Sequence, residues 1–237
     1  QLISKAADDV VTVADHASET ILSALLTDLL PEADLVGEEA AFENPAIFER
    51  LRNGLCWIID PLDGTNNFAQ GKAPFGILIA LSDGGMTIGG WILDCLTGRF
   101  CHASANGGAR VNGERVIAQA TGTTPPIAAL STIFMEPEER VKVAEHIAPH
   151  YTLVDIPRCA AEQYPRLVLG ENDVSIFNRT LPWDHAAGAL FLNEAGGKSA
   201  RMDGSDYRVN EWERRGMIGA STPQLWEELA NRMAKLA

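Results

Sequence analysis

The chain has 237 residues, of which 46% are hydrophobic and 22% charged, a balance that excludes a disordered, collagenous or coiled-coil protein. Its 32 acidic residues outnumber 19 basic ones and give a formal charge of −13, which argues against a nucleic-acid partner and favours a divalent cation. No apolar run approaches the ~20 residues of a membrane-spanning helix, so no membrane partner is expected.

The cysteines indicate the redox compartment. The four cysteines are Cys56, Cys95, Cys101 and Cys159. Because they lack C-x-x-C spacing and no histidines cluster near them, the sequence argues against a zinc site. We therefore expect four buried thiols, a reducing compartment and a cytoplasmic location.

The first residues predict one long helix followed by strands that end in acidic residues. Apolar spacing over residues 8–30 indicates a helix, and residues 35–37 a short strand. A short helix is expected at 47–51. Residues 56–59 are a continuous apolar run that ends abruptly at Asp60, which is typical of a buried strand opening into a loop.

Three β-rich runs then predict an antiparallel meander. They cover residues 75–81, 86–93 and 99–103, and turn-forming residues separate them. The glycine-rich stretch at 106–113 is interpreted as further turns, and 121–126 as a linker. We therefore expect an N-terminal α+β lobe, residues 1–122, that carries the metal-binding loop.

The remainder alternates strand-like and helical runs, which predicts a C-terminal α/β lobe, residues 123–237, that completes the active site. Strands are expected at 127–131, 152–156, 174–177 and 217–220, and helices at 136–147, 160–169, 184–195 and 223–236. Thr222 is the expected N-cap of the last helix.

Five carboxylates lie at the ends of apolar runs or at the head of an expected helix: Glu38, Glu39, Asp60, Asp63 and Asp184. Solvent exposure of element ends would explain any one of them alone. For Asp60 and Asp63 together, a proline after the first and Gly-Thr after the second predict that both side chains meet at a common centre. Hard oxygen ligands in this number suit Mg²⁺.

The residues after the second aspartate add a phosphate site. Residues 64–66 could open a helix whose backbone N–H groups hold a phosphate. Residues 62–65 are also similar to the nucleophile loop of haloacid-dehalogenase-type phosphatases, but the position of the attacking aspartate is Pro61. An aspartyl-phosphate intermediate is therefore disfavoured, which leaves metal-activated water as the nucleophile.

Residues 57–68 resemble the first signature of the inositol monophosphatase family, and residues 181–188 with 194–197 resemble the second. Residues 37–39, and Lys5 with residues 9–15, look like two further elements of the family in the right order. The resemblance implies an α/β protein with a layered α/β/α/β/α sugar-phosphatase fold, Mg²⁺-dependent hydrolysis of a small phosphate monoester, and inhibition by lithium.

Metal ligands follow from the resemblance residue by residue. Glu38, Asp60 and the Leu62 carbonyl look like ligands of one ion, and Asp60, Asp63 and Asp184 like ligands of a second, so that Asp60 bridges the two. Glu38 would also touch a third ion through water. Two or three Mg²⁺ ions are therefore expected.

The resemblance also assigns residues to the reaction. Thr65 and Asp15 look like the pair that polarises the attacking water. By the same resemblance, Glu38 and Glu39 would lie near the water of the first metal and take part in the reaction. The phosphate would be held by the backbone amides of Gly64 and Thr65, and the substrate contacts are Asp63, Gly64, Thr65 and Asp184. Since family members are often homodimers, a homodimer is expected.

One position departs from the family pattern. Inositol-specific members have a glutamate seven residues before the aspartate of the second signature, and Phe177 stands there in this chain. Arg158, Asn178 and Arg179 could hold another alcohol or a second phosphate, or form surface salt bridges. His185 is expected to orient or pack, Trp183 to pack in the core, and Lys5 to face the metals or solvent.

The sequence leaves the substrate open. An inositol monophosphate-like or other sugar or polyol phosphate is the leading interpretation. The same chemistry on a 3′-phosphoadenosine nucleotide, fructose bisphosphate or histidinol phosphate is the first alternative. A non-catalytic scaffold that only binds metal is the second.

Overall fold

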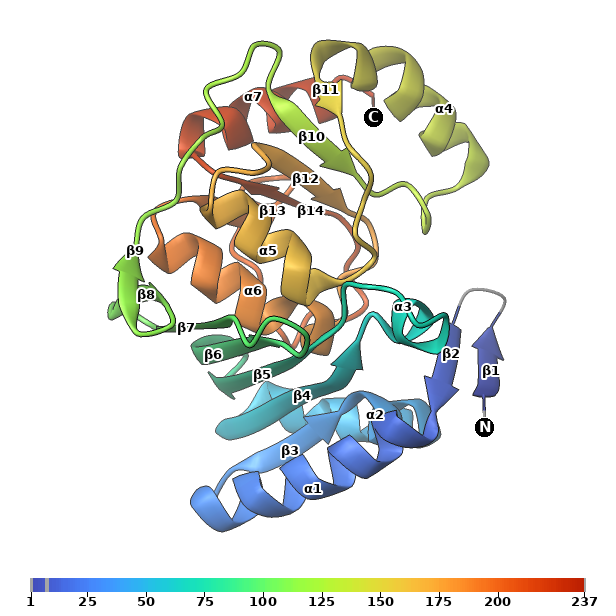
Figure 1. The fold of residues 1–237 in the computed structure, drawn as a ribbon, viewed down its shortest axis with the longest axis vertical. Helices are drawn as coiled ribbons and strands as arrows, with labels where there is room; N and C mark the ends of the chain where they lie inside the picture. The colour runs from blue at the N-terminus through green and yellow to red at the C-terminus, as the bar shows by residue number, and fades with distance from the viewer. Residues whose placement is uncertain (1, 7–8, 237) are drawn as a thin grey trace.

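Five layers build the molecule in the computed structural model, which describes residues 2–6 and 9–236 and the side chains from residue 12 onward. Helices, a seven-stranded sheet, further helices, a five-stranded sheet and outer helices follow one another along the long axis (Figure 1). The expected α/β class and layered α/β/α/β/α fold are confirmed. The position expected for the Lys5 side chain lies outside the described residues.

The larger sheet is a meander with one parallel strand added at its edge. β3 pairs in parallel with β4, and every later pair is antiparallel. In spatial order the strands are β3 (Asp34–Gly37), β4 (Leu55–Asp63), β5 (Gly76–Asp83), β6 (Met86–Asp94), β7 (Phe100–Ser104), β8 (Gly108–Val111) and β9 (Glu114–Val116). The predicted meander is confirmed, but residues 106–113 do not form turns alone, because β8 lies within them.

The smaller sheet is mixed. β11, β10 and β12 are parallel, whereas β14 and β13 run antiparallel to their neighbours. In spatial order the strands are β11 (Thr152–Leu153), β10 (Ile127–Leu130), β12 (Val174–Phe177), β14 (Met217–Ala220) and β13 (Lys198–Arg201). β12 and β14 have the predicted bounds, and β13 was not predicted.

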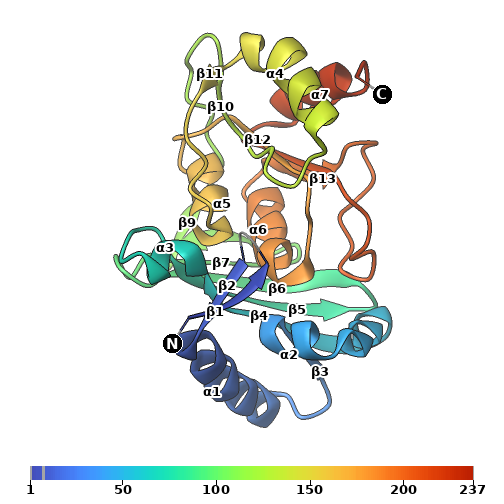
Figure 2. The same ribbon diagram turned by 90° about the vertical axis from the view of Figure 1, so that its right-hand side faces the viewer.

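Helices separate and cover the sheets (Figures 1 and 2). Below the larger sheet lie α1 (Val13–Leu29) and α2 (Glu38–Glu43); between the sheets, α5 (Ala160–Val168) and α6 (Pro182–Glu194); above the smaller sheet, α4 (Pro137–His146) and α7 (Pro223–Met233). Shorter helices are α3 (Thr65–Ala69) and two 3₁₀ segments, η1 (Pro45–Arg52) and η2 (Ala148–His150). Thr222 caps α7 as predicted, since its hydroxyl accepts the Leu225 N–H.

The predicted helix at 8–30 begins too early. Residues before it form a hairpin of β1 (Leu2–Ala6) and β2 (Asp9–Thr12), and α1 starts at Val13. Thr12 and Asp15 form a capping box, in which the Thr12 hydroxyl accepts the Ala14 N–H and the Asp15 carboxylate accepts the Thr12 N–H. This box fixes the helix start after the β-branched residues of β2.

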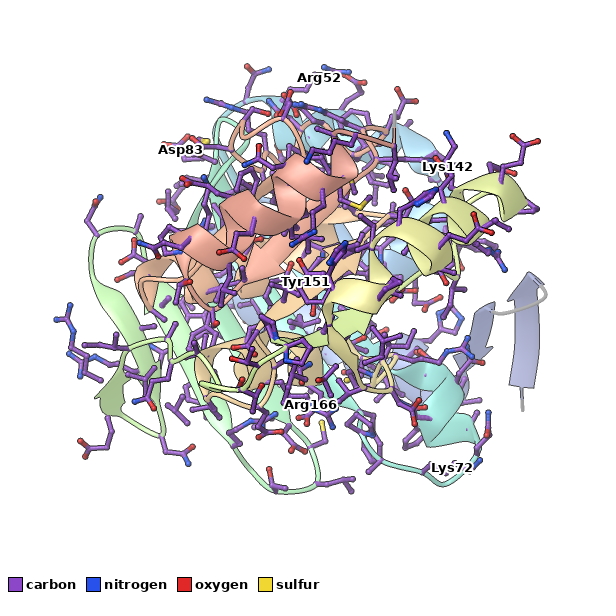
Figure 3. All side chains as sticks on the ribbon, turned by 90° about the horizontal axis from the view of Figure 1, so that it is seen from above. Arg52, Lys72, Asp83, Lys142, Tyr151 and Arg166 are labelled. Carbon is purple, nitrogen blue, oxygen red and sulfur yellow. The ribbon has the colours of Figure 1, made fainter. Side chains whose placement is uncertain are left out.

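α6 is the most buried helix and packs directly on the larger sheet. A Cβ on Gly90 of β6 would lie 2.9 Å from the Ala187 Cα, so only glycine permits this close approach. Trp183 is buried against Phe48, which confirms the expected core position. In Figure 3, Tyr151 lies centrally near α4 and α7, whereas Arg52 and Lys72 project at the rim.

The cysteines, the linker and the absence of a membrane-spanning segment were also predicted from the sequence. Cys56, Cys101 and Cys159 are buried thiols, but Cys95 is exposed in the turn after β6, so that part of the cysteine prediction is wrong. Residues 117–126 connect the sheets without helix or strand, and the division at 122/123 stays a prediction. Among the described residues, no helix is long and apolar enough to cross a membrane.

Candidate metal and phosphate site

A β-bulge brings the first two aspartates together. Side chains three residues apart on a regular strand point to opposite faces. Asp60 pairs with Leu78 and Asp63 with Gly76, so β4 uses three steps where β5 uses two. The extra residue of the bulge returns Asp63 to the face of Asp60. The predicted loop at residue 60 is therefore a continuation of the strand.

Asp184 joins this pair from α6. Carboxylate oxygens of Asp60, Asp63 and Asp184 lie within 4.8 Å of one another. The helix begins two residues earlier than predicted, with Leu181 as N-cap, so Asp184 occupies the first turn and does not serve as the cap. The positive end of the helix dipole favours a carboxylate at this position.

The buried negative charge of this carboxylate cluster favours binding of a cation. Burial, followed by the charges of Glu38, Asp63 and Asp184, raises the pKa of Asp60 well above its usual value. Burial also raises the pKa of Asp63 to about 6, although hydrogen bonds such as that from the Ala161 N–H lower it. Negative charge is thus concentrated where little water can stabilise it, and a divalent cation would offset that cost. The donor set, all carboxylate oxygens, fits Mg²⁺.

Backbone contacts hold these carboxylates in place. Asp60 Oδ1 accepts the Leu62 N–H at 3.0 Å, and Asp63 Oδ2 accepts the Ala161 N–H at 2.6 Å. The second bond places Asp63 at the N-terminus of α5. Ser18 of α1 donates to the Pro61 carbonyl at 2.9 Å, so a helix on the other face supports the bulge.

Glu38 and Glu39 start α2, where a third glutamate organises the backbone. Glu19 accepts the N–H groups of Glu39 and Ala40 at 2.8 and 2.9 Å. A Cβ on Gly37 would lie 2.4 Å from the Glu19 Cδ, so this arrangement requires glycine there. Glu38 lines the same pocket as the aspartates, whereas Glu39 is buried and lines a separate, polar pocket with Glu19.

Thr65, the first residue of α3, bonds to Asp15 in the first turn of α1. Thr65 follows Gly64, whose φ of +82° begins α3, so the expected helix start is confirmed. The Thr65 Oγ1 lies 3.1 Å from Asp15 Oδ1 and 2.9 Å from the Leu62 carbonyl oxygen. A hydroxyl has one proton to donate to either acceptor and retains lone pairs for a water molecule.

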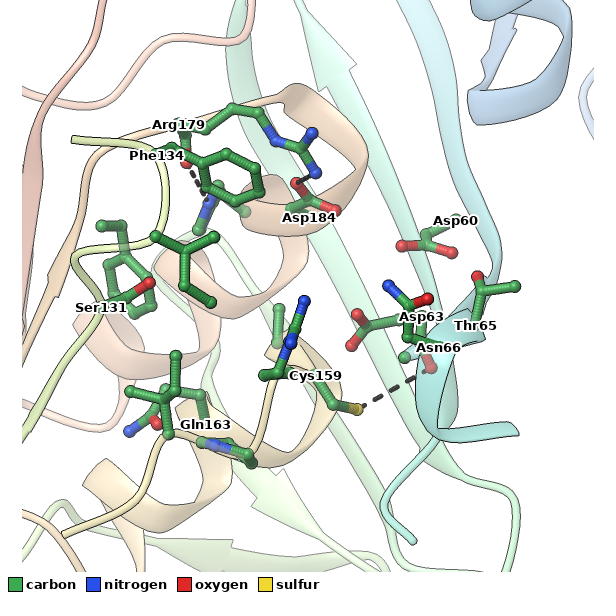
Figure 4. Close-up of a pocket in the computed structure, with 18 of the residues that line it drawn as sticks. Asp60, Asp63, Thr65, Asn66, Ser131, Phe134, Cys159, Gln163, Arg179 and Asp184 are labelled. Carbon is green, nitrogen blue, oxygen red and sulfur yellow. Dashed lines mark hydrogen bonds and ion pairs between the residues drawn. The ribbon is translucent and has the colours of Figure 1, made fainter. Parts of the chain in front are cut away.

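The carboxylates open into a pocket of about 170 Å³, shown in Figure 4. Its lining includes the site residues Asp60, Asp63, Gly64, Thr65 and Asp184, and also Arg158, Phe177, Asn178 and Arg179. The structure therefore brings the predicted metal, phosphate and leaving-group residues into one pocket. Of the residues predicted to act on the water, Asp15 contacts this pocket through Thr65, and Glu39 lines the separate pocket.

His185 packs beneath the pocket. Tyr164 Oη lies 2.9 Å from His185 Nδ1, and His185 Nε2 lies 3.0 Å from the Arg179 carbonyl oxygen. Burial lowers the pKa of His185 to about 3, so the ring is neutral, with Nε2–H donating to the carbonyl and Nδ1 accepting from the tyrosine. This geometry supports the expected orienting and packing role.

Sequence reasoning missed three residues that shape the site. Glu19 holds the start of α2, and Asn67 Nδ2 donates to the carbonyls of Pro74 and Pro157 at 2.8 and 3.0 Å. Phe134 lies under the Arg179 guanidinium, 4.1 Å from ring centroid to Cζ. Only Asn67, inside the first signature, carried a signal in the sequence, because Glu19 and Phe134 depend on packing between distant elements.

Fold and site together define a layered α/β/α/β/α protein with a cluster of carboxylates in a pocket between its two larger sheets. The family model for the inositol monophosphatase family matches residues 2–236, and the chain belongs to that family. The chain is 28% identical to the chloroplastic phosphatase IMPL1 of Arabidopsis thaliana over 95% of its own length, and it spans 62% of the length of that relative.

Two further relatives are matched over a larger share of their own length. The inositol-1-monophosphatase of Bacillus subtilis is 29% identical over 86% of this chain and 77% of its own length. The crystal structure of the extragenic suppressor protein suhB from Bartonella henselae superimposes with a TM-score of 0.84, covering 99% of this chain and 88% of that one at 23% identity. The latter similarity supports the fold.

Proposed function

We propose that the chain hydrolyses phosphate monoesters of small alcohols in a Mg²⁺-dependent reaction. The observation that carries the proposal is the mutual proximity of the carboxylates of Asp60, Asp63 and Asp184 within 4.8 Å, in a pocket that also contains Gly64 and Thr65. Membership of a phosphatase family supports it.

Five groups would hold the metal ions, two or three in number: the carboxylates of Glu38, Asp60, Asp63 and Asp184 and the Leu62 carbonyl. When bound, Mg²⁺ lowers the pKa of water and neutralises charge on the phosphate. Since the charges of Glu38, Asp63 and Asp184 all act on Asp60, Asp60 would contribute to holding more than one ion.

The remaining residues orient the water and the phosphate. Thr65 would donate a hydrogen bond to Asp15 and accept one from the water, and Glu39, at the start of α2, would lie near the same water. The water oxygen bonds to phosphorus as the bond from phosphorus to the alcohol oxygen breaks; one proton of the water passes to the alcohol oxygen, and the other stays on the phosphate. The N–H groups of Gly64 and Thr65 hold the phosphate at the beginning of α3.

Phosphate release from a panel of esters tests the function. The panel is inositol 1-phosphate, glycerol 2-phosphate, fructose 1,6-bisphosphate, 3′-phosphoadenosine 5′-phosphate and histidinol phosphate, each with Mg²⁺ and with chelator. We expect release from at least one ester that stops in chelator. Mg²⁺ binding without release from any ester would instead support the non-catalytic scaffold.

Removing the Thr65 hydroxyl is expected to lower kcat more than it raises KM. Thr65→Val keeps the branched shape but cannot orient a water, which should cost about a hundredfold in kcat. Thr65→Ser restores the hydroxyl and should regain most of the rate. Steady-state phosphate release measures both variants, and equal losses in the two would show that the hydroxyl has no role in the reaction.

We also propose that the protein works in the cytoplasm as a homodimer that lithium inhibits. The free state of all four cysteines supports a reducing compartment. Membership of the family supports the dimer and the inhibition. Sedimentation of the purified chain and a lithium titration of phosphate release test these two points.

A further inference from the structure

The pocket has two ends of different chemistry. At one end stand the four acidic residues, Glu38, Asp60, Asp63 and Asp184, and α3. The other end is formed by the loop after β10 and the end of β12, and the loop before α5 joins the two ends, since Asn67 of α3 donates to its Pro157 carbonyl. This second end would receive the alcohol part of a phosphate ester whose phosphate lies at the carboxylates, so it decides which alcohol is accepted.

The second end is mainly apolar. Six of its lining residues form an apolar wall and lie beside the polar Ser131: Ile133, Phe134, Ile156, Pro157, Ile176 and Phe177. Sugar hydroxyls placed against such a wall would lose water without gaining protein partners, which costs free energy for each hydroxyl. An apolar ring gains free energy from the same contact.

The amide N–H groups of Asn178 and Gln163 in the pocket lining are already bonded to the protein. Asn178 Nδ2 donates to the Phe134 carbonyl, and Gln163 Nε2 donates to Ser175 Oγ at 2.8 Å. Gln163 Oε1 has no hydrogen-bond partner within the described structure, but it is buried below the surface of the wall. These amides therefore shape the wall and offer little to a ligand with many hydroxyls.

Charged and aromatic side chains in the pocket further limit which alcohols it can accept. Two cationic residues, Arg158 and Arg179, line the pocket together with the carboxylates. The Arg179 guanidinium stacks on Phe134 at 4.1 Å and lies 4.0 Å from Asp184 Oδ2 (Figure 4). Flat uncharged rings stack well on guanidinium and phenyl groups, whereas the positive charges of Arg158 and Arg179 would repel a cationic alcohol.

We infer that the alcohol of the substrate carries a flat, uncharged, mostly apolar ring instead of several hydroxyls or a positive charge. The inference rests on the proposed phosphatase function and names the substrate class of that same site. It follows from the apolar wall, the bonded amides and the Arg179–Phe134 stack, none of which belongs to the expected metal or phosphate contacts.

Comparison of kcat/KM across five esters with Mg²⁺ tests the inference. The esters are 2-phenylethyl phosphate, glycerol 1-phosphate, inositol 1-phosphate, histidinol phosphate and fructose 1,6-bisphosphate. We expect 2-phenylethyl phosphate to exceed each of the others by at least about tenfold. 3-Phenylpropylphosphonate, its non-hydrolysable analogue, should also bind more tightly in calorimetry than 3,4-dihydroxybutylphosphonate, the analogue of glycerol 1-phosphate.

A matched pair of variants assigns the preference to the wall. Phe134→Ala should lower kcat/KM for 2-phenylethyl phosphate about tenfold more than that for glycerol 1-phosphate. The control is Phe100→Ala, because Phe100 has the same exposed fraction, 40%, but lies on β7 outside the pocket lining. It should change neither value.

A preference for any other ester, or no release at all, would contradict the inference. Preference for glycerol 1-phosphate, inositol 1-phosphate or histidinol phosphate overturns the inference and leaves the phosphatase function standing. Preference for fructose 1,6-bisphosphate does the same and assigns the two arginines to a second phosphate. No release from any ester overturns the phosphatase function and the inference with it.

Discussion

Asp60→Asn is expected to abolish phosphate release, by about a thousandfold or more, and to raise the melting temperature of the chelator-treated protein. The loss of rate follows because Asp60 is the proposed bridging ligand, and metal ions supply most of the charge stabilisation in phosphoryl transfer. The gain in stability follows because burial and the charges of Glu38, Asp63 and Asp184 raise the pKa of Asp60. Its ionised form therefore destabilises the metal-free fold at neutral pH.

Asparagine is well suited to this test. Its side-chain oxygen can still accept the Leu62 N–H that Asp60 Oδ1 accepts at 3.0 Å, so the bulge is retained. The measurements are phosphate release with Mg²⁺ and thermal unfolding with and without chelator. Mg²⁺ should raise the melting temperature of the wild type more than that of the variant, because the ions bind the folded state.

Asp94→Asn is the matched control with the opposite sign. Asp94 is also buried, which raises its pKa, but the Thr97 hydroxyl, the N–H groups of Leu96 and Thr97 and the Arg99 charge together bring that pKa below its ordinary value. This variant should lose stability and keep its activity. A stable, active Asp60→Asn protein would remove Asp60 from the proposed reaction.

Local chemistry explains why the sequence predicted the carboxylate end of the pocket so well. Asp60 and Asp63 are separated by only two residues of one strand, so their proximity is visible in the sequence, although β5 and Ser18 of α1 help to shape the bulge. The apolar runs of β12 (Val174–Phe177) and β14 (Met217–Ala220) likewise stand between clear turn signals, and their bounds match. Such features depend on neighbours in the chain, which a sequence displays directly.

The alcohol end of the pocket was less predictable for the converse reason. Phe134 lies in a loop, and its place beside Arg179 depends on Asn178 bonding to its carbonyl across the sheet end. β8 (Gly108–Val111) was interpreted as turns because glycines interrupt the alternation that marks a strand. Cys95 was expected in the core because cysteine is usually buried, a tendency that a turn position overrides here.

Gly188→Ala is expected to lower the free energy of unfolding by about 2 kcal/mol, although alanine favours helices over glycine by about 1 kcal/mol. A Cβ on Gly188 would lie 1.9 Å from the Tyr164 Cδ2, and Tyr164 is fully buried between α5 and α6. The ring cannot turn away freely, because its hydroxyl bonds to His185 Nδ1 at 2.9 Å and its face stacks on Phe177. The helices must therefore separate.

Thermal unfolding measures the effect, which should lower the melting temperature by about 4–8 °C for a chain of this size. Tyr164→Leu leaves room for the added methyl group, so this change should cost less in the Gly188→Ala background than in the wild type. Additive losses, or a higher melting temperature for Gly188→Ala alone, would contradict the close approach. Since α6 also carries Asp184, a shift of this helix should lower Mg²⁺ affinity as well, which connects the packing of two helices to the geometry of the metal site.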